Sequence, residues 1–131
     1  FGNETTFGDE TTFGDMTKFG DETTFGYGTT FGHWTKFGDK TTFGDKTTYN
    51  GIKNCKIKTL SNIDGSGRQI LCIFSEDKTY IEAGCFFGTL DEFAEKAKLE
   101  NKMIYATAIP AFCKAVIKAI NQPQGGEWES E

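Results

Sequence analysis

The side chains best suited to chemistry are concentrated in two short segments, Tyr27-Gly28 and His33-Trp34. His33 is the only histidine of the chain, and histidine is the side chain that most often serves as a general acid or base near neutral pH. A general base also needs a neighbouring group that orients its ring. The sequence offers no clear candidate for that group beside His33. We therefore expect no catalytic residue and no enzyme activity.

The four cysteines give no sign of a metal site. Cys55, Cys72, Cys85 and Cys113 form no Cys-x-x-Cys pair, and no histidine cluster lies near them, whereas zinc sites need such groups. Each lies among apolar neighbours, which favours buried free thiols over disulfides. Free thiols are typical of a reducing compartment, so we expect a cytoplasmic protein. We expect neither a bound metal nor a cofactor.

The first third of the chain repeats a six-residue word, FGDETT, with small variations. A threonine stands two residues before each later phenylalanine. Positions two apart share one face of a β-strand, so each Thr-x-Phe places both side chains inward. The two residues that follow the glycine then form a corner. The predicted core ladder consists of Phe1, Phe7, Phe13, Phe19, Phe25, Phe31, Phe37 and Phe43.

This word resembles the hexapeptide repeat of left-handed parallel β-helices, with phenylalanine in place of the usual aliphatic residue. In that family three words make one triangular coil of about 18 residues. The resemblance implies a mainly β fold, with a short left-handed β-helix of about three coils over residues 1–60. The outward threonines then form ladders similar to those of insect antifreeze solenoids. Plain β-propensity of threonine is the preferred interpretation.

Two neighbouring words depart from the pattern at their corners. Most corners carry ordinary turn residues such as Asp-Glu or Asp-Lys, but these two carry bulky aromatic side chains. Exposed aromatic clusters mark interfaces or ligand sites. Three interpretations stay open: burial beneath the C-terminal module or simple drift of the repeat, an interface between subunits, and a site for a ligand or another protein. The candidate binding or interface residues are Met16, Tyr27, Thr30, Phe31, His33 and Trp34.

The hexapeptide-repeat family also includes acyltransferases, in which a histidine commonly serves as general base. The resemblance would give His33 that role. Those enzymes have longer solenoids and loops that protrude from the coils, whereas this repeat is short and has no insertions. Acyl transfer is therefore the least favoured alternative.

Residues 61–121 are expected to form a capping module with two strands and two helices. RQILCIFSE and KTYIEAGCFFG read as a hairpin with its turn at Glu76-Asp77. Thr89 and Glu92 form a capping box that begins the first helix. Pro110 is expected to start the second helix, which runs to Ile120, in preference to interrupting a helix that begins near Met103. Residues 122–131 are expected to be a flexible acidic tail, or to dock through the ring of Trp128.

Charge and hydropathy exclude two classes of partner. The chain has 14 basic and 19 acidic residues, and such an acidic balance argues against nucleic-acid binding. No run of 18 apolar residues is present, so we expect no membrane span. An open end of a solenoid exposes strand edges and tends to associate. The C-terminal module covers one end and the first coil begins directly in repeat, which predicts a non-enzymatic structural protein that forms a homo-oligomer by stacking or as a trimer.

The stretch YIEAGCFFGTLDEF, together with the repeats, is similar to small phage- and prophage-encoded proteins with Thr-Phe-Gly-Asp repeats. The function of that family is uncharacterised. The resemblance implies an alternative, namely an accessory protein that acts against host defence. Such a protein would bind a small molecule or a host protein through Tyr27, His33 and Trp34, and association with the virion is possible on this view.

Overall fold

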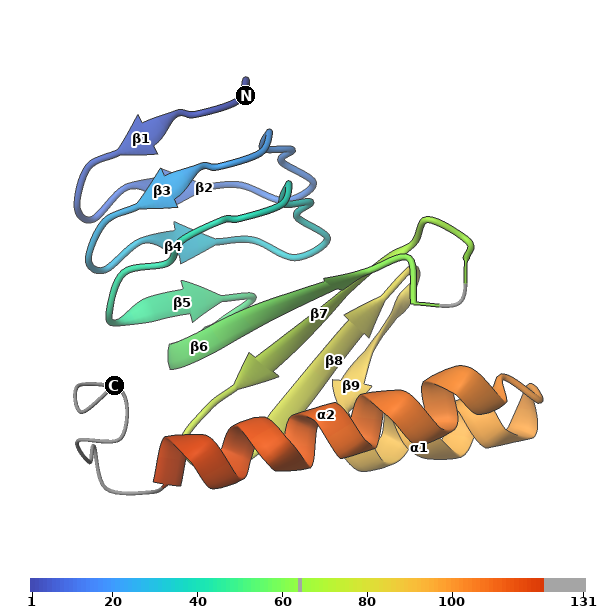
Figure 1. The fold of residues 1–131 in the computed structure, drawn as a ribbon. Helices are drawn as coiled ribbons and strands as arrows, with labels where there is room; N and C mark the ends of the chain where they lie inside the picture. Colours follow the sequence, from blue (N-terminus) through green and yellow to red (C-terminus); the bar gives the residue numbers. More distant parts are fainter. Residues whose placement is uncertain (64, 122–131) are drawn as a thin grey trace, which may run out of the picture.

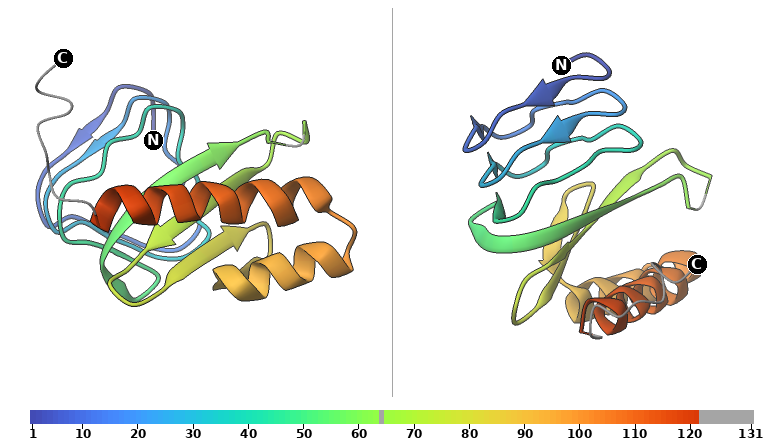
Figure 2. Two further views of the ribbon diagram at one scale, coloured as in Figure 1. Left: turned by 60° about the horizontal axis from the view of Figure 1, so that its bottom comes forward. Right: turned by 60° about the vertical axis from the view of Figure 1, so that its left-hand side comes forward.

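The computed structural model describes residues 1–63 and 65–121, and this part of the chain is mostly β-structure followed by two helices. Figure 1 shows three tiers. The repeat region, which we define as residues 1–49, lies above an antiparallel sheet, and the two helices lie on the far side of that sheet. Figure 2 shows the same order from two further directions.

The repeat region passes over itself at a constant interval of 18 residues. Its pairing is parallel: Thr6 pairs with Thr24, and Thr30 pairs with Thr48. We call residues 1–18, 19–36 and 37–49 the first, second and third layers. The strands are β1 (Thr6–Phe7), β2 (Thr12–Phe13), β3 (Thr24–Phe25), β4 (Thr30–Phe31) and β5 (Thr47–Tyr49).

Three sides result from this stacking, and we name each after its residue in the second layer. The Thr24 side places Thr24 between equivalent threonines of the other two layers, and so does the Thr30 side. On the Lys36 side, Lys36 pairs with Lys18. Two sides therefore carry columns of outward threonines, and the third carries outward lysines, as the 18-residue interval predicts.

Phenylalanine rings fill the interior of the repeat region. Rings one layer apart stack nearly parallel, with centroids 5.5 Å apart for Phe7 and Phe25 and 5.7 Å apart for Phe25 and Phe43. Rings from consecutive words meet edge to face, as Phe25 and Phe31 do at 4.8 Å. Both geometries are favoured by the ring quadrupole. The inward threonines are satisfied locally, because the hydroxyl of each donates to a glycine carbonyl three residues earlier, as Thr29 does to Gly26 at 2.9 Å.

The parallel pairing ends at Tyr49, earlier than the boundary at residue 60 that the repeat suggested. Asn50 and Gly51 both have positive φ, 49° and 81°, the backbone of a tight hairpin turn for which Asn-Gly is the preferred sequence. Strand β6 (Ile52–Ser61) therefore runs back antiparallel to β5. Cys55 pairs with Thr47 across this hairpin, so the residues after Gly51 do not continue the parallel pairing.

The sheet continues through β7 (Gln69–Phe74), β8 (Thr79–Ala83) and β9 (Phe86–Thr89), all antiparallel. The predicted hairpin is present as β7 and β8. The second predicted strand is broken at Gly84, whose φ is 57°, so that β9 folds back beside β8. Strand β7 is the most buried because both of its faces are covered.

Helix α1 (Leu90–Leu99) begins at the predicted capping box, in which Thr89 and Glu92 each bond the backbone of the other. Helix α2 (Met103–Asn121) contains Pro110 in its interior, so the prediction that this proline starts the helix is wrong. Packing explains the difference, since Tyr105 and Ile109 are buried on the sheet side. Burial of such a face outweighs the local cost of an interior proline.

By length and composition alone, α2 is also apolar enough to cross a membrane, over Met103–Ile120, with a mean hydropathy of 1.5. In this structure its buried residues pack against the sheet. The predicted tail, residues 122–131, lies outside the described residues.

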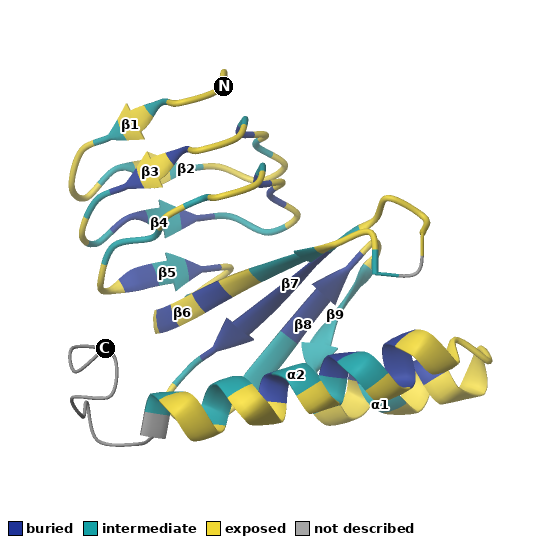
Figure 3. Ribbon diagram, viewed as in Figure 1, coloured by how far each residue is buried: buried dark blue, intermediate teal, exposed yellow. Residues whose placement is uncertain are grey.

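Two hydrophobic cores lie on opposite faces of the sheet. One joins the phenylalanine ladder to Ile57, Leu71 and Ile73, and the other lies between the sheet and the helices around Cys72 and Ile109. Figure 3 shows burial increasing from the exposed first layer toward the sheet. The sheet therefore closes the C-terminal end of the phenylalanine ladder.

Candidate functional site

Each corner of the repeat region requires one residue with a left-handed backbone. The fourth residue of the word has positive φ at every corner, for example 58° at Glu10, 60° at Met16 and 57° at Trp34. Gly28 holds the same place with a φ of 73°, a conformation that glycine adopts without strain. The substitution of glycine for the usual acidic or basic residue at position 28 is therefore explained by the backbone of the corner.

The third residue of the word ties one layer to the next. The Oδ1 atom of Asp9 accepts a hydrogen bond from the backbone N–H of Tyr27 at 2.9 Å. Asp15 accepts in the same way from the N–H of His33, and Asp21 from the N–H of Asp39. These carboxylates lie against the glycines of the next layer, which leaves no room for a Cβ at those positions.

His33 has an acidic neighbour that the sequence did not reveal. Its Nε2 atom lies 3.1 Å from Oδ2 of Asp15, and its ring contacts Trp34 edge to face at a centroid distance of 4.1 Å. Asp15 lies 18 residues earlier in sequence and directly below His33. Asp9 and Asp21 make the equivalent backbone contact at other corners. The position of Asp15 below His33 therefore follows from the repeat and is not specific to His33. The prediction of no catalytic residue stays a prediction.

Trp34 lies where the repeat region meets the sheet. Its backbone N–H donates to Glu82 at 2.9 Å, and the hydroxyl of Tyr49 donates to the other oxygen of Glu82. Glu82 is 5% exposed, and burial raises the pKa of its carboxyl, an effect that the two hydrogen bonds partly oppose. Burial is also the main cause that raises the pKa of Tyr49.

Gln69 completes the cover of the Lys36 side. Its Oε1 accepts from the N–H of Phe37 at 2.8 Å, and its Nε2 donates to the carbonyl of Thr35 at 3.2 Å. Sequence reasoning missed both Gln69 and Glu82. The available signal was a lone acid within the apolar run Tyr80-Ile81-Glu82-Ala83, because a buried charge needs partners.

The predicted binding patch is divided between separate surfaces. Phe31 is 1% exposed and belongs to the interior ladder, while Thr30 is half-buried on its side of the repeat region. Tyr27 and Trp34 are 49% and 42% exposed, but they line two different grooves. Among the described residues, no hydrogen bond or ring contact joins Tyr27 to His33 or Trp34. The exposed Met16 lies one layer below Trp34, where its N–H bonds the carbonyl of His33 at 3.0 Å.

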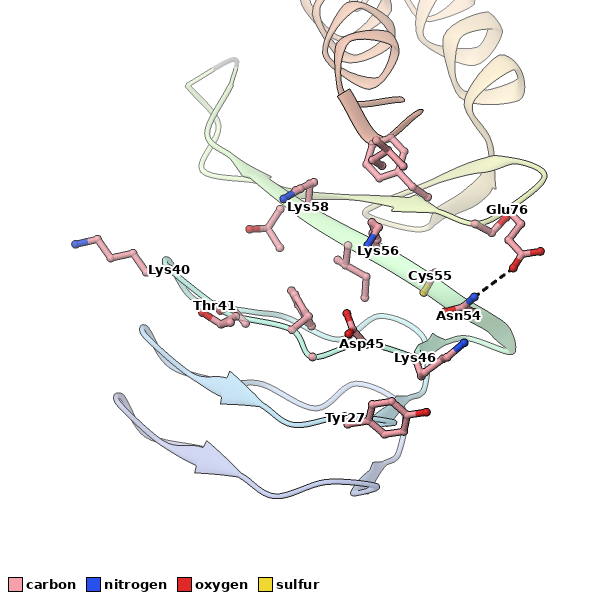
Figure 4. A pocket seen from close by; sticks show the side chains of 18 residues that line it. Tyr27, Lys40, Thr41, Asp45, Lys46, Asn54, Cys55, Lys56, Lys58 and Glu76 are labelled. Atoms are coloured by element: carbon pink, nitrogen blue, oxygen red, sulfur yellow. Dashed lines mark hydrogen bonds between the residues drawn. The ribbon is translucent and has the colours of Figure 1, made fainter. Parts of the chain in front are cut away.

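The groove beside Trp34 has a volume of about 540 Å³ and is lined by basic groups from both parts of the molecule, Lys36 and Arg68. The groove beside Tyr27 is larger, about 840 Å³, and lies between the Thr24 side and strand β6. Figure 4 shows four lysines around this second groove, Lys40, Lys46, Lys56 and Lys58.

The cysteines follow the prediction with one exception. All four are free thiols, and Cys55, Cys72 and Cys113 are buried. Burial raises the pKa of the Cys55 thiol to about 11. Cys85 is exposed, contrary to expectation, because the turn between β8 and β9 places it at the edge of the sheet. Among residues 1–63 and 65–121 no cluster of metal-binding side chains is present.

The edge of the first layer is the most open surface of the repeat region. Phe1 is 63% exposed, and Phe7 and Phe13 are half-buried, whereas Phe25 one layer above is 1% exposed. The N–H groups of Thr30 and Thr48 donate to the layer below, whereas the equivalent N–H of Thr12 has no acceptor among the described residues.

Comparisons of the chain with protein-family models, with curated proteins and with solved structures find no match.

Proposed function

We propose that the protein is a non-enzymatic structural protein that pairs with a second copy of itself. Its repeat region is taken as a short left-handed parallel β-helix, as the hexapeptide resemblance implies, and the first layer is taken as the interface. The observation that carries the proposal is the open edge of that layer, with exposed Phe1 and half-buried Phe7 and Phe13. An uncovered strand edge above apolar rings is a template for pairing.

The backbone of this edge carries donors that have lost their usual acceptors. In the second and third layers, Thr30 and Thr48 donate to the carbonyls of Thr11 and Thr29 in the layer below, at 2.9 Å and 3.0 Å. The equivalent N–H of Thr12 meets no acceptor among the described residues. A second copy offers the same pattern of donors and carbonyls in return.

The opposite end of the repeat region limits the assembly to two copies. There the antiparallel sheet covers the ladder, so a further layer cannot be added by a neighbour. Association through the first layer alone brings identical surfaces together, which gives a closed twofold dimer. Of the assemblies that the sequence suggested, stacking of two copies end to end therefore fits better than a trimer.

Light scattering coupled to size exclusion, over a range of protein concentrations, tests this proposal. Wild-type protein is expected to form a dimer. Thr12→Pro removes the outward N–H on an edge strand, where proline is tolerated, and should weaken the dimer at least about tenfold. Thr12→Ala keeps the N–H and is the matched control, expected to dimerise.

Thermal unfolding of both variants establishes that the fold is intact. Glu4, Asp9 and Glu10 lie at corners of the first layer. Pairing through that layer would bring them near the same acids of the second copy, so added salt should strengthen the dimer by screening. A wild-type monomer at every concentration contradicts the proposal. So does equal dimerisation of Thr12→Pro and Thr12→Ala.

A second candidate function is the binding of a small anionic aromatic molecule in the groove beside Trp34. The observation in its favour is the exposed indole of Trp34 above a cavity that also holds Lys36 and Arg68. A nucleoside monophosphate is a suitable probe, because its base can stack and its phosphate can bind the cations. Thermal stabilisation that is lost in Trp34→Ala but retained in Tyr27→Ala supports this candidate, and no stabilisation of wild type contradicts it.

A further inference from the structure

At the end of the repeat region nearest the sheet, its three sides are covered in different ways. On the Thr30 side, β6 pairs with β5. On the Lys36 side, Glu82 and Gln69 take up the backbone groups of residues 34–37. On the Thr24 side, residues 40–44 line the larger groove and receive no strand from the described part of the chain.

The uncovered edge on the Thr24 side has specific unpaired groups. One layer below, the N–H of Phe25 donates to the carbonyl of Thr42 at 2.9 Å, and the carbonyl of Thr23 accepts from the N–H of Thr42 at 2.9 Å. The equivalent groups of the third layer are the N–H of Phe43 and the carbonyl of Thr41. Neither has a partner among the described residues, and both residues line the groove.

The groove combines an apolar floor with a basic rim. Its apolar lining comes from Phe43 and Ile57, and its rim carries four lysines, Lys40, Lys46, Lys56 and Lys58. Two acids also line it, Asp45 and Glu76, and Glu76 already accepts a hydrogen bond from Asn54 at 3.2 Å. The formal charge of the lining is therefore positive in a chain whose net charge is −5.

The chain itself continues from this groove. Ile120, near the end of α2, is one of its lining residues, and ten residues, 122–131, follow the described part of the chain. The last five, Glu127-Trp128-Glu129-Ser130-Glu131, carry three carboxylates and one large ring. The five residues before them span up to about 17 Å when extended, and they include Pro123, Gly125 and Gly126.

We propose that residues 127–131 dock in this groove as an added strand on the edge formed by residues 41–43. Addition of an extended segment to an open sheet edge is a common mode of peptide recognition. In an extended segment the three glutamates share one face and Trp128 lies on the other. The ring of Trp128 packs on the apolar floor, and the glutamates face the lysines. This inference is independent of the dimer, which uses the opposite end of the repeat region.

The first test uses the full chain with Trp34→Phe, so that Trp128 is the only tryptophan. Docking predicts that acrylamide quenches Trp128 less in this protein than in a free peptide of residues 122–131. It also predicts that the Phe43 amide exchanges with deuterated solvent at least about tenfold more slowly when residues 122–131 are present than after their removal. Equal quenching, or equal exchange with and without the segment, overturns the proposal.

Charge reversal distinguishes docking from a nonspecific effect. Lys56→Glu with Lys58→Glu should release Trp128 to acrylamide, and further reversal of the three glutamates to lysine should restore its protection. Lys53→Glu with Lys78→Glu is the matched control, because both lysines are exposed and neither lines the groove. Release by the control pair, or no rescue in the combined variant, overturns the proposal.

The concentration dependence of quenching identifies the source of the segment. Protection that is independent of protein concentration is expected for docking within one molecule. Protection that appears only at high concentration overturns this assignment, since the groove then holds the segment of a second copy. Thr12→Pro should leave Trp128 protected, so failure of the dimer and failure of docking give different results.

Discussion

The first and second layers of the repeat region are built from the same word and have different surroundings. In the first layer Phe1 is 63% exposed, whereas Phe25 and Phe31 in the second layer are each 1% exposed. The difference comes from what lies above and below, because the second layer has a neighbour on each side and the first has only one. The word thus specifies the shape of a layer, and stacking determines how much that layer contributes to stability.

Removal of one ring from each of these two layers gives the largest expected difference. Phe25→Ala deletes a ring that stacks on Phe7 below and Phe43 above, and should cost about 3–5 kcal/mol in the free energy of unfolding. Phe7→Ala should cost less than half as much, because Phe7 is partly exposed and stacks on one layer only. Urea unfolding below the dimerisation concentration measures both. Equal losses would show that the layers unfold as one indivisible unit.

The glycines provide a comparison of intermediate size. A Cβ at Gly32 would overlap the carboxylate of Asp15, whereas a Cβ at Gly14 meets no atom within 4 Å. Gly32→Ala should therefore cost about 1–3 kcal/mol through overpacking. Gly14→Ala should change the free energy of unfolding by about 0.5 kcal/mol or less. A similar loss for both alanines, measured by urea unfolding, would mean that Asp15 moves aside freely.

The smallest expected effect is the pH dependence of stability that Glu82 produces at the end of the repeat region covered by the sheet. Burial raises the pKa of Glu82 above its ordinary value of 4.5, so the folded state holds this proton more tightly than the unfolded chain does. The stabilising contribution of Glu82 to the free energy of unfolding is fully present below pH 4.5. It is lost as the pH rises through the raised pKa of the folded state. Each pKa unit corresponds to about 1.4 kcal/mol.

The matched variant is Glu82→Gln, which does not titrate. Urea unfolding of wild type and variant at several pH values should show the wild type losing stability relative to the variant as the pH rises above 4.5. The difference between the two proteins cancels the titration of the exposed carboxylates. A difference that is constant with pH, or that changes in the opposite sense, would contradict the raised pKa.

Short-range patterns in the sequence predicted much of this structure. The Thr-x-Phe spacing indicated which side chains point inward, and the capping box located the start of α1 at Thr89. The Asn50-Gly51 turn was equally local, but the resemblance to hexapeptide repeats extended the expected β-helix past it, to residue 60. Pro110 was misjudged because a local rule was applied where burial of α2 determines the outcome.

The candidate sites were harder to predict, because they depend on contacts between distant residues. The partner of His33 lies 18 residues away and one layer below. The partner of Trp34 is Glu82, which lies 48 residues later in the chain. The sequence suggested one patch around Tyr27 and Trp34, and the corners place these side chains in different grooves.

The constant vertical interval of 18 residues has a consequence for how such a gene can change length. Blocks of its near-identical six-residue words can be removed or duplicated. A block of three words leaves the residues before it on the same side relative to the residues after it. A block of one word moves the residues before it to a different side, so a contact between corners 18 residues apart, such as that of Asp15 and His33, would not form across the altered block. Viable length variants are therefore expected to differ by whole layers.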